Sequence, residues 1–249
     1  MKTIRFIAFV LLAAAASRAA VIYDQPLFWN GSPASAVGNP WNSHQTLAGL
    51  SSGFRAFDSF SLGSAATITQ ATWYGVYLAG SPLANAAPNT SLWSIGFFAD
   101  AAGAPGAVLS TTSLSPGSVT QTLLGAGLFG ANPVNVYQFT ADLNSFDAAA
   151  GTTYWFSPLS QHANAFPAFG WLAAAATQDN TSIQRQIVNN ITTNTFVRGN
   201  DQAFSLSGTV VGNPNPTAAP DAGSTLFLLG AGLAALGWLR RRGVFASCG

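Results

Sequence analysis

Glutamate is absent from this 249-residue sequence, and lysine occurs once, as Lys2. Helix surfaces usually draw on Glu, Lys and Arg for solubility and helix propensity. With only 7% charged residues, the polar surface must come from Ser, Thr, Asn and Gln, which favours a β-rich protein. Between residues 20 and 212 the net charge is −4, which excludes the basic surface that nucleic-acid binding requires. The charges there are Arg55, Arg185, Arg198, Asp24, Asp58, Asp100, Asp142, Asp147, Asp179 and Asp201.

Cysteine and histidine are almost as scarce. Cys248 is the single cysteine, so no intramolecular disulfide can form. His44 and His162 are the two histidines, and neither lies near a Gly-x-Ser-x-Gly turn, so we expect polar loop residues rather than a catalytic base. No His, Cys or Asp spacing matches a zinc site, and no Gly-rich loop followed by lysine could bind phosphate. The sequence therefore predicts no catalytic, cofactor-binding or metal-ligating residue and no cofactor.

Two uses of carboxylates stay open. Glycoside hydrolysis usually needs two carboxylates about 5–10 Å apart, and Asp58 with Asp201 is a possible pair that no motif supports. Calcium accepts Asp, Asn and backbone oxygens. The segment 142–147 has oxygen-bearing side chains at its first, third and sixth positions, which is not a recognised calcium loop. We expect this segment to cap an ordinary turn.

The N-terminus has the three parts of an export signal. Lys2 and Arg5 supply the positive charge, and residues 6–16 form an uninterrupted apolar run. Ser17 and Ala19 are small residues at the −3 and −1 positions of a cleavage site, so we predict a signal peptide over residues 1–19. Eleven apolar residues rise about 16 Å as a helix, against roughly 30 Å of hydrocarbon, which favours a cleaved signal over an uncleaved anchor.

The C-terminus begins with a Pro- and Asn-rich linker over residues 212–219, which we expect to be extended. Residues 225–239 form an apolar run of roughly 22 Å as a helix, short for a membrane span, which snorkelling arginines could lengthen. Arg240, Arg241 and Arg242 follow and predict a cytoplasmic C-terminal end. The sequence therefore predicts a single transmembrane helix, with the middle domain on the outer side. Residues 243–249 form a short tail after the arginines.

This order of motif, short apolar helix and arginines resembles the PEP-CTERM class of sorting signal. The closest variant has the consensus Val-Pro-Asp-Ser-Gly, and Ala219 and Ala222 here replace its Val and Ser. The resemblance implies that an exosortase-type membrane protease removes the helix and that the protein reaches the cell surface or an exopolysaccharide matrix. A plain single-span anchor is the alternative. The predicted signal covers residues 220–242, with the motif formed by Pro220, Asp221, Ala222, Gly223 and Ser224.

Residues 20–211 contain short alternating apolar runs separated by Gly, Pro, Asn and Ser, which is typical of β-strands. With no convincing amphipathic helix, the pattern predicts an all-β domain, an antiparallel β-sandwich of jelly-roll type. Residues 123–131, rich in Gly and Leu, read as helix or loop. The order of runs is also similar to the extracellular β-domain of many exported proteins with this tail. The expected strands are 21–23, 57–62, 67–78, 92–98, 134–139, 152–159, 169–172, 182–188 and 203–210.

Aromatic residues are the class from which binding can be argued. We expect Trp73, Trp93 and Trp155 in alternating strands to be core residues. Trp41 and Trp171 lie near turns and are the candidates for a platform that stacks on sugar rings. The leading hypothesis is a non-catalytic surface or matrix protein. The alternatives are a carbohydrate-binding module for exopolysaccharide and an extracellular hydrolase that uses His44 or His162.

Overall fold

The structure is a computed structural model that describes residues 19–47, 52–80, 84–164, 166–175, 179 and 181–212. The chain divides into two units, Met1–Val210 and Val211–Gly249. Residues 1–18 of the predicted signal peptide lie outside the described residues. So do residues 213–249, which include most of the predicted linker, the sorting motif, the transmembrane helix and the tail.

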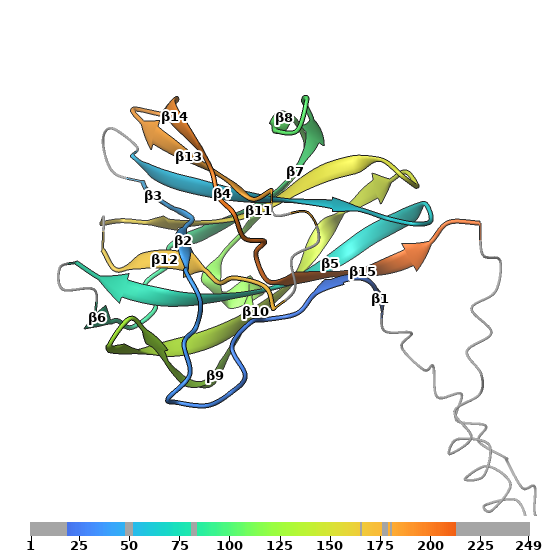
Figure 1. Ribbon diagram of the computed structural model, residues 1–249. Coiled ribbons are helices and arrows are strands. Elements are labelled where there is room, and N and C mark those ends of the chain that lie inside the picture. Colours follow the sequence, from blue (N-terminus) through green and yellow to red (C-terminus); the bar gives the residue numbers. More distant parts are fainter. Residues whose placement is uncertain are drawn as a thin grey trace, which may run out of the picture. The chain divides into compact units, whose positions relative to one another are not determined.

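The described residues form two β-sheets, seen as two layers in Figure 1. All strand pairs are antiparallel except β3 with β11. The eight-stranded sheet has the order β1 (Ala20–Gln25), β15 (Phe204–Val210), β5 (Ala66–Ala79), β10 (Asn132–Ala148) and β9 (Thr120–Phe129), joined by β12 (Ala168–Trp171), β2 (Trp41–Asn42) and β6 (Ala84–Asn85). The seven-stranded sheet has the order β14 (Ile191–Val197), β13 (Ile183–Val188), β4 (Gly53–Ser61), β3 (His44–Thr46), β11 (Thr153–His162), β7 (Leu92–Asp100) and β8 (Pro105–Leu114).

The predicted all-β fold is confirmed, and each of the nine expected strands corresponds to a strand of the structure. The strands could be predicted because buried and exposed side chains alternate along them. In β5 the side chains of Ala71 and Trp73 are buried, whereas Thr72 and Tyr74 are partly exposed on the opposite face. A 3₁₀ turn, Pro116–Ser118, is the one helical element of the described residues. Within this part of the chain, no helix has the length and apolar character needed to cross a membrane.

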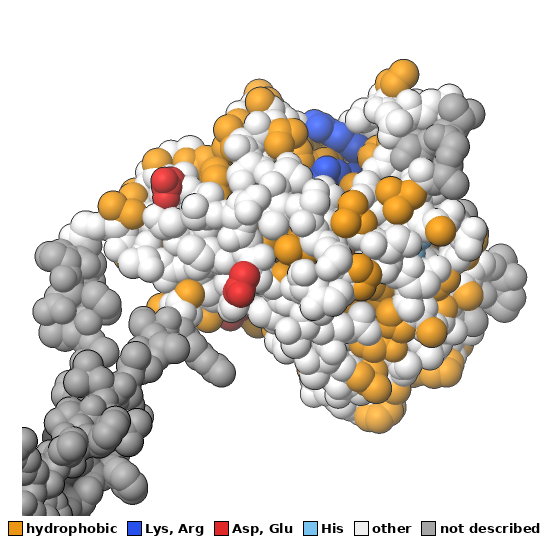
Figure 2. All heavy atoms as spheres, turned by 180° about the vertical axis from the view of Figure 1, so that it is seen from behind, with side chains coloured by type: hydrophobic (Ala, Val, Ile, Leu, Met, Phe, Trp, Pro, Cys, Tyr) orange, Lys and Arg blue, Asp and Glu red, His pale blue; other side chains and the backbone are white. Residues whose placement is uncertain are grey.

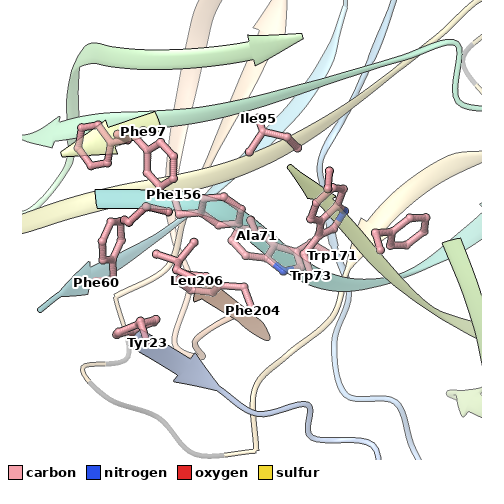
Figure 3. Close-up of a cluster of buried hydrophobic side chains, with 14 of the residues drawn as sticks. Tyr23, Phe60, Ala71, Trp73, Ile95, Phe97, Phe156, Trp171, Phe204 and Leu206 are labelled. Carbon is pink, nitrogen blue, oxygen red and sulfur yellow. The ribbon is translucent and has the colours of Figure 1, made fainter. Parts of the chain in front are cut away.

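The core lies between the sheets and consists mainly of aromatic rings (Figure 3). Trp73 stacks on Phe139 with ring centroids 5.7 Å apart, and Trp93 meets Phe169 edge to face at 4.9 Å. Such pairs contribute about 0.5–1.5 kcal/mol beyond their buried area. Trp155 is buried in a smaller cluster with Phe57, Phe98 and Ile183. The prediction that Trp73, Trp93 and Trp155 are core residues is therefore confirmed.

The expectation of a helix or loop over residues 123–131 is wrong, because most of this segment belongs to strand β9. Its glycines are needed for packing against Trp29. A Cβ atom added at Gly127 would lie 2.8 Å from Trp29 Nε1 and 2.4 Å from Val37 Cγ1. The glycines that suggested a loop therefore belong to a strand, where the absence of side chains allows another segment to pack closely against the backbone.

Candidate functional site

Three aspartates far apart in the sequence meet at one point of the structure. Asp58 lies in β4, Asp201 lies three residues before β15, and Asp179 precedes β13. One carboxylate oxygen from each lies within 4.8 Å of the others. Asp58 and Asp201 are 0% exposed, whereas Asp179 is exposed. These three residues, here called the acidic cluster, hold three of the seven carboxylates of residues 20–212.

Backbone and hydroxyl groups hold the acidic cluster in place. Asp58 Oδ1 accepts a hydrogen bond from Ser59 N at 2.9 Å, and Asp58 Oδ2 accepts one from Gln202 N at 2.5 Å. Asp179 Oδ2 accepts from Ser59 Oγ at 2.5 Å, and Asp179 N donates to Asp201 Oδ2 at 3.3 Å. Burial raises the pKa of the Asp58 carboxyl well above its usual value; the neighbouring carboxylates also raise it, and the two backbone donors lower it.

The structure brings together Asp58 and Asp201, the pair that the sequence left without support for glycoside hydrolysis. Both carboxylates are fully buried, so no sugar ring can reach them in this conformation. The arrangement places oxygen atoms around a common point, which suits the binding of a small cation better than attack on a glycosidic bond.

The segment 142–147 does not form the expected turn, because it lies inside strand β10. Asp142 accepts a hydrogen bond from Gln70 Nε2 at 3.0 Å, and Asp147 accepts one from Thr67 Oγ1 at 2.6 Å. Both donors belong to β5. A register shift between Asp142 and Phe146 inserts extra residues into β10 there. These carboxylates therefore serve cross-strand pairing at a bulge.

The two histidines are not the loop residues that the sequence predicted. His44 lies in β3 and His162 in β11, both are buried, and their rings are 6.1 Å apart. Strands β3 and β11 pair in parallel, which brings these distant positions together. Burial lowers the pKa of His44 to about 4, and burial together with the neighbouring His44 lowers the pKa of His162 to about 4.

His162 joins a hydrogen-bonded chain that sequence reasoning missed. Its Nδ1 contacts Asn89 Oδ1, and its Nε2 lies 2.7 Å from Ser160 Oγ. Because the amide oxygen only accepts, Nδ1 carries the proton and Nε2 accepts from Ser160. Thr90 Oγ1 lies 2.7 Å from Ser160 Oγ, and Tyr77 OH lies 2.6 Å from Thr90 Oγ1. The hydroxyl protons can therefore all be donated in one direction: Tyr77 donates to Thr90, Thr90 to Ser160, and Ser160 to His162.

The order Ser160, His162, Asn89 has the connectivity of a nucleophile, a base and an orienting group. Accessibility differs from that of a catalytic site, because Ser160 and His162 are both 0% exposed. The Ser160 oxygen also lies within hydrogen-bond distance of Thr90. In this conformation the chain of hydrogen bonds satisfies buried polar groups between strands β11 and β5.

The two predicted sugar platforms differ in outcome. Trp171 is 0% exposed and its Nε1 donates to Ala203 O at 2.9 Å, so the prediction that it stacks on sugar is wrong. It lies in β12, which pairs with both β5 and β2, and its ring packs in the core against Phe156 and Phe204. Trp41 is partly exposed, and the Arg198 guanidinium lies over its ring at 4.2 Å from the centroid. Sugar stacking by Trp41 remains a prediction.

A groove of about 710 Å³ follows the outer face of the eight-stranded sheet. Its side chains are mainly amides and hydroxyls, and they come from β1, β15, β5 and β10. Cross-strand hydrogen bonds fix several of them: Gln138 Nε2 donates to Tyr74 OH at 3.2 Å, and Gln70 donates to Asp142. The surface seen in Figure 2 is likewise mostly uncharged, with few acidic side chains and the basic ones in one recess.

Comparison with known proteins identifies the C-terminal segment. Residues 220–242 match the family model described as the VPDSG-CTERM motif, so this chain carries a PEP-CTERM-like sorting signal there, as predicted. The signal supports export with surface association and implies processing by an exosortase-type membrane protease. No curated protein and no solved structure matches the chain.

Proposed function

We propose that this chain is a non-catalytic cell-surface or extracellular-matrix protein, anchored transiently by a C-terminal membrane helix and then released or re-attached by the sorting protease. The sorting signal at residues 220–242 supports this route. The buried position of Ser160 and His162 supports a role without hydrolysis. On this proposal, residues 20–211 are the displayed module.

The strand orders support a jelly-roll-like sandwich for this module. With the short strands, the edge strand β9 and the β13–β14 hairpin set aside, the first sheet has the order β1-β15-β5-β10 and the second β4-β11-β7-β8. Counted along the chain, these are strands 1-8-3-6 and 2-7-4-5, an order typical of jelly rolls. Such a sandwich presents one sheet face as a broad surface for a ligand.

The groove on the eight-stranded sheet is the observation that supports polysaccharide binding by the module. It offers amide and hydroxyl groups in fixed positions, as sugar hydroxyls require. Tyr74 adds a partly exposed aromatic side chain among these polar groups. Its length across four strands suits an extended chain of sugars more than a small molecule. We propose that an exopolysaccharide binds there.

Substitution in the groove tests this proposal. We expect the Gln70→Ala, Gln138→Ala double variant of the mature protein to bind the host's exopolysaccharide at least tenfold more weakly than the wild type. Two lost hydrogen bonds at about 1 kcal/mol each give this magnitude. The measurement is sedimentation with insoluble polysaccharide or affinity electrophoresis.

The matched control is Gln186→Ala, which removes an amide from β13 on the other sheet. It should bind as the wild type does. Equal binding by the double variant and the wild type would remove the groove as the sugar site. No binding by any form of the protein would leave the sorting route intact and contradict the carbohydrate-binding role.

A further inference from the structure

Two arginines lie opposite each other on neighbouring strands of the seven-stranded sheet. Arg55 of β4 and Arg185 of β13 are register partners in the antiparallel pairing of these strands, so they share one face of the sheet. Ala56, the next residue along β4, packs in the core between the sheets, so the two arginines lie on the outer face. Like charges placed directly opposite each other are destabilising. A negative charge between the two side chains would replace this repulsion with attraction.

No carboxylate in the described part of the chain supplies that negative charge. Arg55 Nε donates to Ser157 Oγ at 2.9 Å, and Arg185 Nη2 donates to Pro105 O. The carboxylate of Asp100 in β7 accepts hydrogen bonds from an indole and a backbone amide instead. Arg55 Nη2 and Arg185 Nε are buried and have no hydrogen-bond partner among the described residues. The pair therefore lacks acceptors as well as negative charge.

The surrounding side chains hold the two guanidinium groups in place. Arg55 Cζ lies 4.8 Å from the ring centre of Phe98 and 5.6 Å from that of Phe57. The Arg55 side chain reaches over β11 to β7, where a Cβ atom added at Gly96 would lie 2.8 Å from Arg55 Nη2. Arg185 Cζ also lies over the Phe57 ring, at 5.3 Å from its centre. Both charges are thus positioned beside one aromatic ring before any ligand binds.

The pair stays charged and reaches the surface. Burial and the positive charge of Arg185 lower the pKa of Arg55 to about 10, and burial also lowers the pKa of Arg185. Both groups are still protonated at neutral pH, and both side chains are partly exposed. The contact of Arg185 with Pro105 joins β13 to β8, which rise on the same side of the sheet in Figure 1. Figure 2 shows basic side chains gathered in a recess of the surface.

We propose that Arg55 and Arg185 bind one oxyanion at this place, here called the arginine recess. A guanidinium presents a planar fork of N–H donors that matches the oxygen atoms of a carboxylate, sulfate or phosphate group. Residues 20–212 carry a net charge of −4, which repels a polyanion and favours a single acidic group on a mainly neutral chain. We assign the oxyanion to an acidic sugar of a polysaccharide, an assignment that rests on the proposed function. Free inorganic phosphate is the other source with this chemistry.

The side-chain signals of arginine report this binding directly. Residues 20–224 contain three arginines, Arg55, Arg185 and Arg198, so the mature protein labelled with ¹⁵N-arginine gives three Nε–H signals. Sodium glucuronate should shift the signals of Arg55 and Arg185 and leave that of Arg198 in place. Inorganic phosphate should shift the same two signals, because it offers the same oxygen atoms. Glucose, which has no acidic group, should shift none.

Substitution of one arginine provides the matched test. Arg185→Gln should weaken glucuronate binding at least tenfold, because it removes one of the two charged donors. Arg185 is partly exposed, so this variant should fold. Arg198→Gln removes the same charge and is the control. Arg198 contacts Trp41 and Gln184, and Gln184 points to the face of β13 opposite Arg185, so the control should bind as the wild type does.

The two sources of the anion and the site itself can fail separately. A shift with phosphate but none with glucuronate would contradict the assignment to an acidic sugar and retain the oxyanion site. No shift with either anion at about 50 mM, well above a Kd of about 1 mM, would overturn the proposal. Equal affinity in Arg185→Gln and wild type would overturn it as well. The groove lies on the other sheet, so its test with Gln70 and Gln138 stays independent of these results.

Discussion

Replacing Trp73 with alanine should lower the free energy of unfolding by about 3–5 kcal/mol, the usual cost of removing a large buried aromatic side chain. Trp73 is fully buried between the sheets, stacks on Phe139 and meets Trp93 edge to face at 5.1 Å. Residues 20–212 contain no cysteine, so no disulfide offsets such a loss. Guanidinium unfolding of the mature protein, followed by far-UV circular dichroism, measures the change.

Trp41→Ala is the matched control for this experiment. Trp41 has the same side chain, but it is partly exposed and is packed against the core from outside, with Arg198 over its ring. Its removal should cost less than about 2 kcal/mol, mainly a cation–π contact and limited buried area. Equal losses for the two variants would contradict the central place of Trp73 in the core.

Acidification should destabilise the protein through His44 and His162. Their folded-state pKa values are lowered to about 4, against an ordinary value near 6.5. Between about pH 6.5 and pH 4 the unfolded chain therefore binds two protons that the native protein excludes. The free energy of unfolding is therefore higher at neutral pH, and it decreases as the pH falls through this range. Each histidine accounts for about 3 kcal/mol over this window.

Asp58 acts in the opposite direction, because its raised pKa makes the native protein less stable as pH rises through that value.

A His44→Asn variant isolates the histidine contribution. Among the residues that the structure describes, none is a hydrogen-bond partner of His44 Nδ1, so the substitution removes a titrating group without breaking a described bond at that atom. Its stability should vary less between pH 6 and 4.5 than that of wild type, by about 1.4 kcal/mol per pH unit. Thr192→Ala, exposed in β14, should keep the wild-type slope; an unchanged slope in His44→Asn would refute this origin of acid sensitivity.

The strands that the sequence predicted are those with one face in the core, and three of the longer missed strands lie at the sheet edges. β8, β9 and β14 end the strand orders of their sheets. At least half of the residues in each are exposed: five of ten in β8, five of ten in β9, and six of seven in β14. An edge strand that contributes little to the core has no need of alternating apolar residues. Only backbone pairing with a neighbouring strand defines it.

The candidate sites were harder to predict because strand pairing assembles them. His44 and His162 meet through the parallel pairing of β3 and β11, across 118 positions of sequence. Asp58, Asp179 and Asp201 likewise converge from three separate segments. Asp58 lies in Phe57-Asp58-Ser59-Phe60, a charged residue inside an apolar strand, and that inconsistency is the one sequence signal that pointed to it. The sorting signal could be predicted because its parts are contiguous.

The identity of the mature C-terminus tests the proposed sorting route most directly. Peptide mass spectrometry of the protein purified from its native host should find peptides that end between Ala219 and Ser224, with none from Thr225 onward. This result is expected if the signal at residues 220–242 is removed and the β-domain is displayed outside the membrane. Intact peptides containing Arg240, Arg241 and Arg242 in the membrane fraction would contradict processing and would show that the helix is a permanent anchor.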